Sequence, residues 1–146
     1  MNYIKEAFVT TLLLGVVGYV GSVSAHEQNG ALGKAASATD YYQVTCSDDG
    51  NGPADHLFVQ IKDVAPAVKP LVSVLVINGL QAQNTTDAVD GDATGSPALN
   101  IKGKTTTYYM LVSKTAAGVE TYSLDYHCLT LSGAHTGTDI FPFQNQ

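Results

Sequence analysis

The chain has 146 residues and a formal net charge of −6 at pH 7. It contains no arginine, and its lysines are scattered rather than clustered. Nucleic acids and anionic membrane surfaces attract proteins through clustered cationic side chains, which displace counterions. The composition therefore excludes both as expected partners.

The first residues have the layout of a secretory signal peptide. Lys5 precedes an apolar stretch over residues 7–20, and small side chains follow up to Ala25. The apolar stretch is shorter than the roughly 20 residues that a membrane-spanning helix needs. We expect residues 1–25 to be removed, so that a secreted or periplasmic protein begins at His26. The alternative is an uncleaved membrane anchor.

The remaining part, about 120 residues, fits one domain with a single core. Residues 26–39 are small and polar with little periodicity, so we expect a flexible N-terminal arm. Frequent Gly and Pro and short runs of Val, Thr and Tyr indicate an all-β chain beyond it. We therefore predict that residues 40–146 form a two-sheet antiparallel β-sandwich of the jelly-roll or immunoglobulin-like kind.

Alternation of apolar and polar residues locates the expected strands. Residues 40–46 place Tyr42 and Val44 on one face, and residues 56–63 do the same with Leu57, Val59 and Ile61. Residues 71–77 are apolar at nearly every position, as in a central strand. Between these strands and after them, residues 47–55 and 81–97 are polar and predict loops.

The second half of the chain contains the longest alternating run, residues 120–131. Its predicted inner face carries Tyr122, Leu124, Tyr126 and Cys128, while Ser123, Asp125 and His127 point outward. Two shorter strands are expected before it, over residues 98–101 and 106–113.

Cys46 and Cys128 are the only cysteines, and each lies on the predicted inner face of its strand. An exported protein meets an oxidising compartment, so we predict a disulfide between them. The alternative is a metal site with two thiolates joined by His127. No C-x-x-C pair supports that alternative.

Three segments in order, TDYYQVTC, HLFVQIKD and TTTYYMLVSKTAAGVETYSLDYH, resemble strands of the bacterial pre-peptidase C-terminal domain, a small β-sandwich found in many secreted hydrolases. They match its opening strand, its next strand and its closing pair. Two positions depart from the family pattern: Thr106 replaces a Gly, and Asp55 followed by His56 replaces an Asp pair. The resemblance implies a non-catalytic accessory or binding module that sometimes holds calcium.

An immunoglobulin-like sandwich is the competing analogy. Tyr126 stands two residues before Cys128, as in a tyrosine corner. The chain has no Trp to pack against the disulfide. Both analogies predict two packed sheets.

His26 is the sharpest candidate for metal chemistry. At a mature N-terminus its α-amine and imidazole together can chelate Cu(II). His56, His127 and His135 are the candidates for a second ligand. The alternative is that His26 merely follows a cleavage site.

Two acidic clusters are candidates for calcium. Asp48 and Asp49 lie with Asn51 and Asp55 in one loop, and the other contains Asp87, Asp90 and Asp92. Ca²⁺ takes six to eight oxygens from flexible loops. Neither cluster matches the twelve-residue calcium loop. The alternative is that both are solvated acidic turns.

The sequence contains no H-E-x-x-H or G-x-S-x-G motif, and no nucleophile accompanies Asp125 and His127. We therefore expect a non-catalytic protein that binds a protein or carbohydrate surface. Two other hypotheses remain open: a copper-binding protein that uses His26, and a structural subunit of an extracellular polymer. The second implies self-association, with the N-terminal arm adding to the sheet edge of a neighbour.

Overall fold

The computed structural model describes residues 26–103 and 105–146. This part of the chain contains β-strands and no helix. The expected signal peptide, residues 1–25, lies outside the described residues. The strands are β1 (Glu27–Leu32), β2 (Asp40–Ser47), β3 (His56–Ala65), β4 (Val72–Asn78), β5 (Gln81–Thr86), β6 (Leu99–Ile101), β7 (Thr107–Lys114), β8 (Glu120–Leu129) and β9 (Gly137–Gln144).

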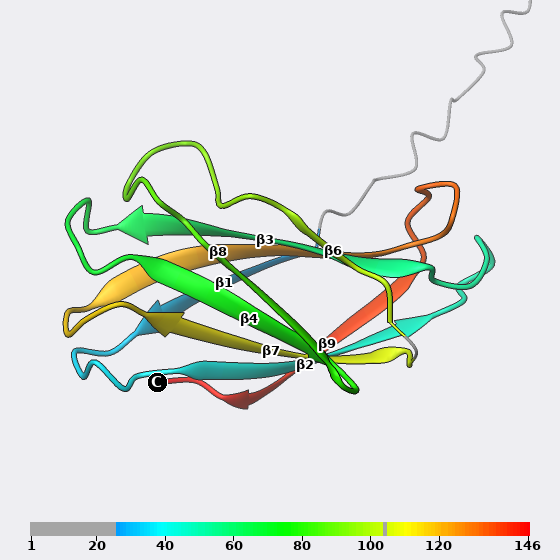
Figure 1. Ribbon diagram of the computed structural model, residues 1–146, viewed down its shortest axis with the longest axis horizontal. Helices are drawn as coiled ribbons and strands as arrows, with labels where there is room; N and C mark the ends of the chain where they lie inside the picture. The colour runs from blue at the N-terminus through cyan, green and yellow to red at the C-terminus, as the bar shows by residue number, and fades with distance from the viewer. Residues whose placement is uncertain (1–25, 104) are drawn as a thin grey trace, which may run out of the picture.

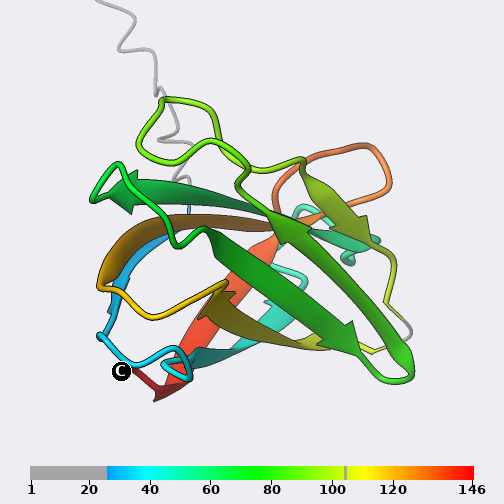
Figure 2. The ribbon, with the colours of Figure 1, turned by 60° about the vertical axis from the view of Figure 1, so that its left-hand side comes forward.

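The strands form two sheets that face each other (Figures 1 and 2). One sheet has the order β1-β8-β3-β6 and the other has the order β5-β4-β7-β2-β9. Every pairing between neighbouring strands is antiparallel. The prediction of an all-β antiparallel sandwich is confirmed.

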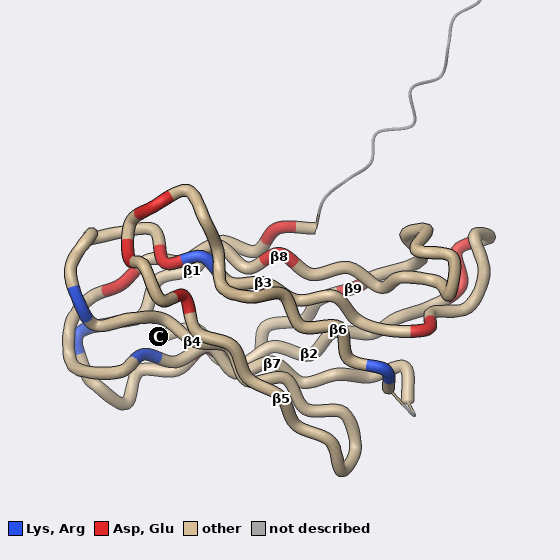
Figure 3. The backbone as a smooth tube through the Cα atoms, turned by 45° about the horizontal axis from the view of Figure 1, so that its top comes forward, with Lys and Arg blue, Asp and Glu red and all other residues tan. Residues whose placement is uncertain are grey.

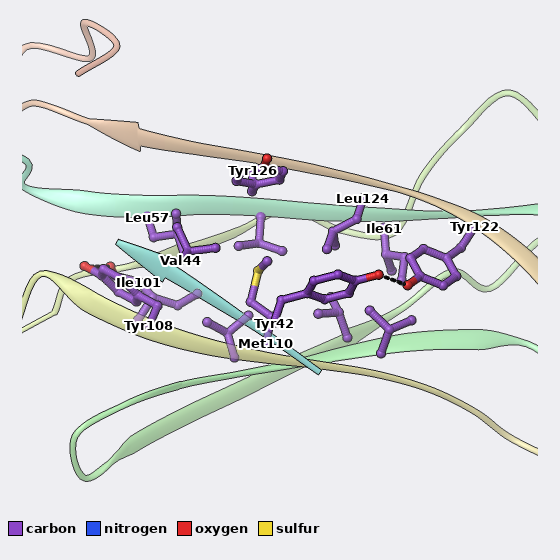
Figure 4. Packing of buried hydrophobic residues seen from close by; sticks show 14 of the residues in the cluster. Tyr42, Val44, Leu57, Ile61, Ile101, Tyr108, Met110, Tyr122, Leu124 and Tyr126 are labelled. Carbon is purple, nitrogen blue, oxygen red and sulfur yellow. Dashed lines mark hydrogen bonds between the residues drawn. The ribbon is translucent and has the colours of Figure 1, made fainter. Parts of the chain in front are cut away.

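Alternation along five strands builds the core. Every second residue of β2, β3, β4, β7 and β8 is buried between the sheets. Figure 4 shows side chains from both sheets meeting there, among them Tyr42, Leu57, Met110 and Leu124. The inward positions predicted for residues 40–46, 56–63 and 120–131 are confirmed.

A disulfide joins the two sheets. Cys46 on β2 and Cys128 on β8 are bonded, with their Cα atoms 5.6 Å apart and a sequence separation of 82 residues. The predicted bridge is confirmed, and the alternative thiolate metal site is excluded. A loop of this length contributes about 4 to 5 kcal/mol in the chain-entropy account.

Strand formation extends beyond the sequence-based expectation at the sheet edges. The segment expected to be a flexible arm contains β1, which pairs along its whole length with β8. Part of the predicted loop over residues 81–97 is β5, which pairs with β4. β9 pairs with β2, where no strand was predicted. These edge strands lack a regular buried face, so backbone pairing rather than an apolar pattern of their own defines them.

Close packing fixes the position of β1. A Cβ atom added to Gly30 would lie 2.3 Å from the hydroxyl oxygen of Tyr122. Only glycine lets the β1 backbone approach the core at this point.

Over residues 26–103 and 105–146, no helix is long and apolar enough to cross a membrane.

Candidate metal centre

At one end of the sandwich, the inward-facing positions of the core strands are occupied by charged residues. On β3 the inward residues Leu57, Val59 and Ile61 are followed by Asp63, and on β8 Glu120 precedes inward Tyr122. The same phase places Asp40 at the start of β2 and Lys114 at the end of β7. All four side chains are buried: Asp40, Asp63, Lys114 and Glu120.

Antiparallel register brings these strand ends together. Asp63 is opposite Tyr122, two residues from Glu120, and Lys114 is opposite Val72 at the start of β4. The segment between β5 and β6 rises beside this end of β3 (Figure 1). Figure 3 shows acidic residues at both ends of the sandwich, and those on this segment belong to the end described here.

Three carboxylates converge at this end. Asp63, Asp90 and Glu120 each offer an oxygen, and the three oxygens lie within 4.8 Å of one another. Asp63 and Glu120 are 0% exposed, and Asp90 is half-buried. Asp63 Oδ1 and both carboxylate oxygens of Asp90 and Glu120 are buried without a hydrogen-bond partner. The site therefore presents five oxygens with unused acceptor capacity.

Backbone hydrogen bonds place Asp90 in this centre. The amide of Asp63 donates to Asp87 Oδ2 at 2.8 Å, and the amide of Gly91 donates to the carbonyl of Asp63 at 3.2 Å. Gly91 has φ +69°, and a Cβ there would lie 2.5 Å from the Cβ of Ala67. The loop is thus tied to β3 on both sides of Asp90.

The electrostatics show how unfavourable three free carboxylates are here. Burial raises the pKa of Asp63 to about 7, and the charges of Asp90, Glu120 and Asp87 act in the same direction. A hydrogen bond from the amide of Val72 opposes the rise. Burial and Asp90 also raise the pKa of Glu120, whereas Lys114 lowers it. Like charges at short range in a desolvated site account for both shifts.

Lys114 compensates only part of this charge. Its Nζ donates to the carbonyls of Gly33 and Gly118, and its charge lowers the pKa of Glu120. If Asp63, Asp90, Glu120 and Lys114 are all ionised, these four side chains together carry a net charge of −2. A divalent cation would neutralise that charge and bind the unpartnered oxygens.

Asp40 provides an internal comparison. Its Oδ2 accepts a hydrogen bond from the hydroxyl of Tyr122 at 2.5 Å, and its Oδ1 accepts one from the amide of Gln146 at 2.7 Å. The hydroxyls of Tyr42 and Tyr122 are 2.6 Å apart, as the dashed line in Figure 4 shows. This buried carboxylate has protein partners, as buried polar groups usually do. The oxygens of the Asp63–Asp90–Glu120 centre lack them.

The donor set favours calcium. Ca²⁺ binds six to eight oxygens at about 2.3–2.6 Å and accepts bidentate carboxylates, whereas Mg²⁺ retains several waters in a strict octahedron. Five carboxylate oxygens leave one to three positions for water or backbone carbonyls. A buried centre made only of oxygens therefore fits Ca²⁺ better than Mg²⁺.

The structure distributes the five aspartates predicted for calcium over different roles. Only Asp90 lies in the centre, whereas Asp87 holds the loop against β3. Asp92 Oδ1 accepts a hydrogen bond from the amide of Thr94 at 2.7 Å. Asp48 and Asp49 lie at the opposite end of the sandwich, where they accept hydrogen bonds from the amides of Gly50, Asn51 and Gly52.

Sequence reasoning missed Asp63 and Glu120. The alternating pattern of their strands could have revealed both residues, because each is a charged residue at a position that the alternation assigns to the core. Such a residue needs a buried partner.

The histidines predicted for copper separate into two groups. The ring centroids of His26 and His127 are 6.1 Å apart, and those of His127 and His135 are 4.5 Å apart. His56 instead contacts Asp55, with Nδ1 2.9 Å from Oδ2. The structure thus gathers three of the four candidates and pairs the fourth with a carboxylate.

No known protein family matches this chain, and no curated protein matches it either. The resemblance to the pre-peptidase C-terminal domain stays a prediction from strand motifs.

In protein freed of divalent cations, we expect the free energy of unfolding to fall as pH rises from about 4 to about 7, because Asp63 loses its proton at a higher pH in the folded state than in the unfolded state. The folded state keeps a proton on Asp63 up to its pKa of about 7, whereas the unfolded state loses it near pH 4. The folded state therefore binds more protons in this window, and its free energy of unfolding falls as pH rises.

Urea unfolding at several pH values, after treatment with a chelating resin, measures this dependence. Asp63→Asn should remove the share of the fall that Asp63 contributes and leave the share that comes from the raised pKa of Glu120, whereas the exposed Asp92→Asn should retain the whole fall. Equal pH profiles for the wild type and Asp63→Asn would contradict the assignment.

Proposed function

We propose that this protein is an exported, non-catalytic β-sandwich binding module whose Asp63–Asp90–Glu120 centre holds Ca²⁺. The observation that carries the proposal is the set of five buried carboxylate oxygens without hydrogen-bond partners. Asp63 and Glu120 are also fully buried, so a substrate has no access to them. Such burial suits an ion held for stability rather than carboxylates that act on a substrate.

The ion would connect three parts of the chain. Asp63 lies on β3, Glu120 on β8, and Asp90 in the segment between β5 and β6. Binding would neutralise the repulsion among them and hold the segment against the end of the sandwich. Because the unfolded chain lacks this arrangement, the free energy of binding would add to the stability of the fold.

Calcium should raise the melting temperature of the wild type. Extracellular calcium modules have Kd values of about 0.1–1 mM, so 10 mM Ca²⁺ would contribute about 1.4 to 2.7 kcal/mol. For a domain of this size that is a shift of roughly 5–10 °C. Differential scanning calorimetry with 10 mM CaCl₂ or with chelator measures it.

Glu120→Gln should abolish this shift and stabilise the calcium-free protein at neutral pH, because it removes one of three repelling charges and keeps the side-chain shape. Asp92→Asn serves as the matched control and should respond to calcium as the wild type does. A wild-type melting temperature that is equal with and without calcium would refute the centre.

Export has separate support. Residues 1–25 have the pattern of a signal peptide, and the Cys46–Cys128 disulfide is typical of proteins from oxidising compartments. Intact mass spectrometry of protein recovered after export should show a chain that begins at His26, and thiol labelling under denaturing conditions should find no free thiol. A mass that retains residues 1–25 would show that the segment is not cleaved.

The outer face of the five-stranded sheet is the surface proposed for a partner. Rings on β2, β7 and β9 form a row, with centroids 5.9 Å apart between Tyr41 and Tyr109 and 5.1 Å apart between Tyr41 and Phe143. Phe141 extends the row at 5.2 Å from Phe143, and these two residues are 59% and 51% exposed. Contiguous exposed rings commonly mark interaction surfaces.

A neutral carbohydrate fits this aromatic row. Flat rings offer apolar faces on which sugar rings can stack, and tyrosine adds a hydroxyl for hydrogen bonding. The outward positions of β2 and β7 carry no charged residue, and on the same face of β9 Asp139, opposite Thr45, is the charged residue beside the row. Self-association through the same face is the alternative, and it would suit a structural subunit.

Retention on insoluble neutral polysaccharides tests the carbohydrate partner. We expect the wild type to be retained and Phe143→Ala to lose most of this binding. Leu131→Ala, which removes an 81% exposed apolar side chain from another surface, should bind as the wild type does. Sedimentation velocity provides the other outcome: dimerisation or polymerisation abolished by Phe143→Ala would assign the row to self-association.

A further inference from the structure

Three histidines from separate segments gather at the other end of β8. His127 lies on the outward face of β8, His135 follows the turn after β8, and His26 directly precedes β1. His127 is seven residues from Glu120, about 23 Å along an extended strand. The histidine group is therefore distinct from the Asp63–Asp90–Glu120 centre.

Backbone pairing to β8 fixes where the three histidines emerge. The amide of Tyr126 donates to the carbonyl of His26 at 3.1 Å. His135 forms a bridge with Leu129, and the next amide, that of Thr136, donates to the carbonyl of Cys128 at 2.9 Å. The grouping thus follows from the register of the fold.

The imidazoles have unused ligand capacity. The Nδ1 atoms of His26 and His127 are buried and have no hydrogen-bond partner. Phe58 stacks against His127 with ring centroids 5.7 Å apart. Burial, and then the neighbouring His135 and His26, lower the pKa of His127. The neutral imidazole that results is the form that binds metal ions.

We propose that His26, His127 and His135 form a site for a late first-row transition-metal ion, with Cu²⁺ as the preferred ion. Two imidazoles on one ion, with metal–nitrogen bonds of about 2.0–2.1 Å, have ring centroids roughly 4.5 Å apart at a right angle and 6.4 Å apart when opposite. The observed separations of 4.5 and 6.1 Å fall within this range.

Binding requires the rings to turn. Among the described residues, only Asp63, Asp90 and Glu120 have ligand atoms that all lie within 4.8 Å of one another. The three histidines have suitable ring spacing but not yet converging nitrogens. Rotation about side-chain bonds would bring the nitrogens to one ion and leave the paired backbone in place.

The donor type selects the ion. Imidazole nitrogen suits Cu²⁺, Ni²⁺ and Zn²⁺ rather than Ca²⁺, and Cu²⁺ is the tightest of these for a given set of ligands. If export leaves His26 as the first residue, its α-amine adds a fourth nitrogen. The protein would then hold a hard ion at one end of β8 and a softer ion at the other.

Copper titration of the purified, disulfide-bonded protein tests this site. We expect one Cu²⁺ per chain with submicromolar Kd and an electron paramagnetic resonance spectrum that shows nitrogen ligands. His127→Ala and His135→Ala each remove a ligand, so each should weaken binding by more than the roughly 10- to 100-fold that the loss of a group behind a ligand costs. His56→Ala is the matched control, because this histidine is paired with Asp55 outside the group.

A second variant keeps the test clear of folding defects. His127→Phe retains a ring against Phe58 and removes the ligand nitrogens, so it should fold and still lose copper affinity. Circular dichroism and the melting temperature in the absence of added metal check that the fold is intact. Equal Cu²⁺ affinity in the wild type and in the His127 and His135 variants would overturn the proposal, as would wild-type binding weaker than about 1 µM, near −8.2 kcal/mol.

Discussion

The carboxylate oxygens of Asp63, Asp90 and Glu120 are buried close together, and the structure of one end of the sandwich depends on how their negative charge is offset. Their closest oxygens lie within 4.8 Å of one another, and Asp63 and Glu120 have no contact with solvent. Three ionised carboxylates in that space would repel one another strongly. The segment between β5 and β6 brings Asp90 to this site. The position of that segment therefore depends on the cation or proton that offsets the negative charge of the three carboxylates.

The two ends of the sandwich are therefore closed by different interactions. Cys46 and Cys128 lie near the far ends of β2 and β8, and their disulfide joins the two sheets there. At the opposite end, the proposed ion would link β3, β8 and the loop that contains Asp90. A domain of this size has a small core, so both interactions would add to its stability.

Most of the fold could be predicted from the sequence, because the central strands bury alternate residues. β2, β3 and β8 follow their predicted inner faces, and the cysteines on two of those faces predicted the disulfide. β1, β5 and β9 were not predicted, because each lacks a regular buried face and is defined by pairing with a neighbour. The candidate centre was only partly accessible: Asp90 was a candidate, but its convergence with Asp63 and Glu120 depends on register and on the path of a loop. The grouping of His26, His127 and His135 depends on register in the same way.

The most direct test of the central claim is a crystal structure of the protein grown with millimolar calcium. The account predicts one strong density peak among Asp63, Asp90 and Glu120, with carboxylate oxygens at about 2.3–2.6 Å and six to eight oxygens in total. The peak should disappear in Glu120→Gln crystals grown under the same conditions. Carboxyl groups hydrogen-bonded to one another at saturating calcium, with no ion between them, would contradict the account and show that protons alone balance the charge.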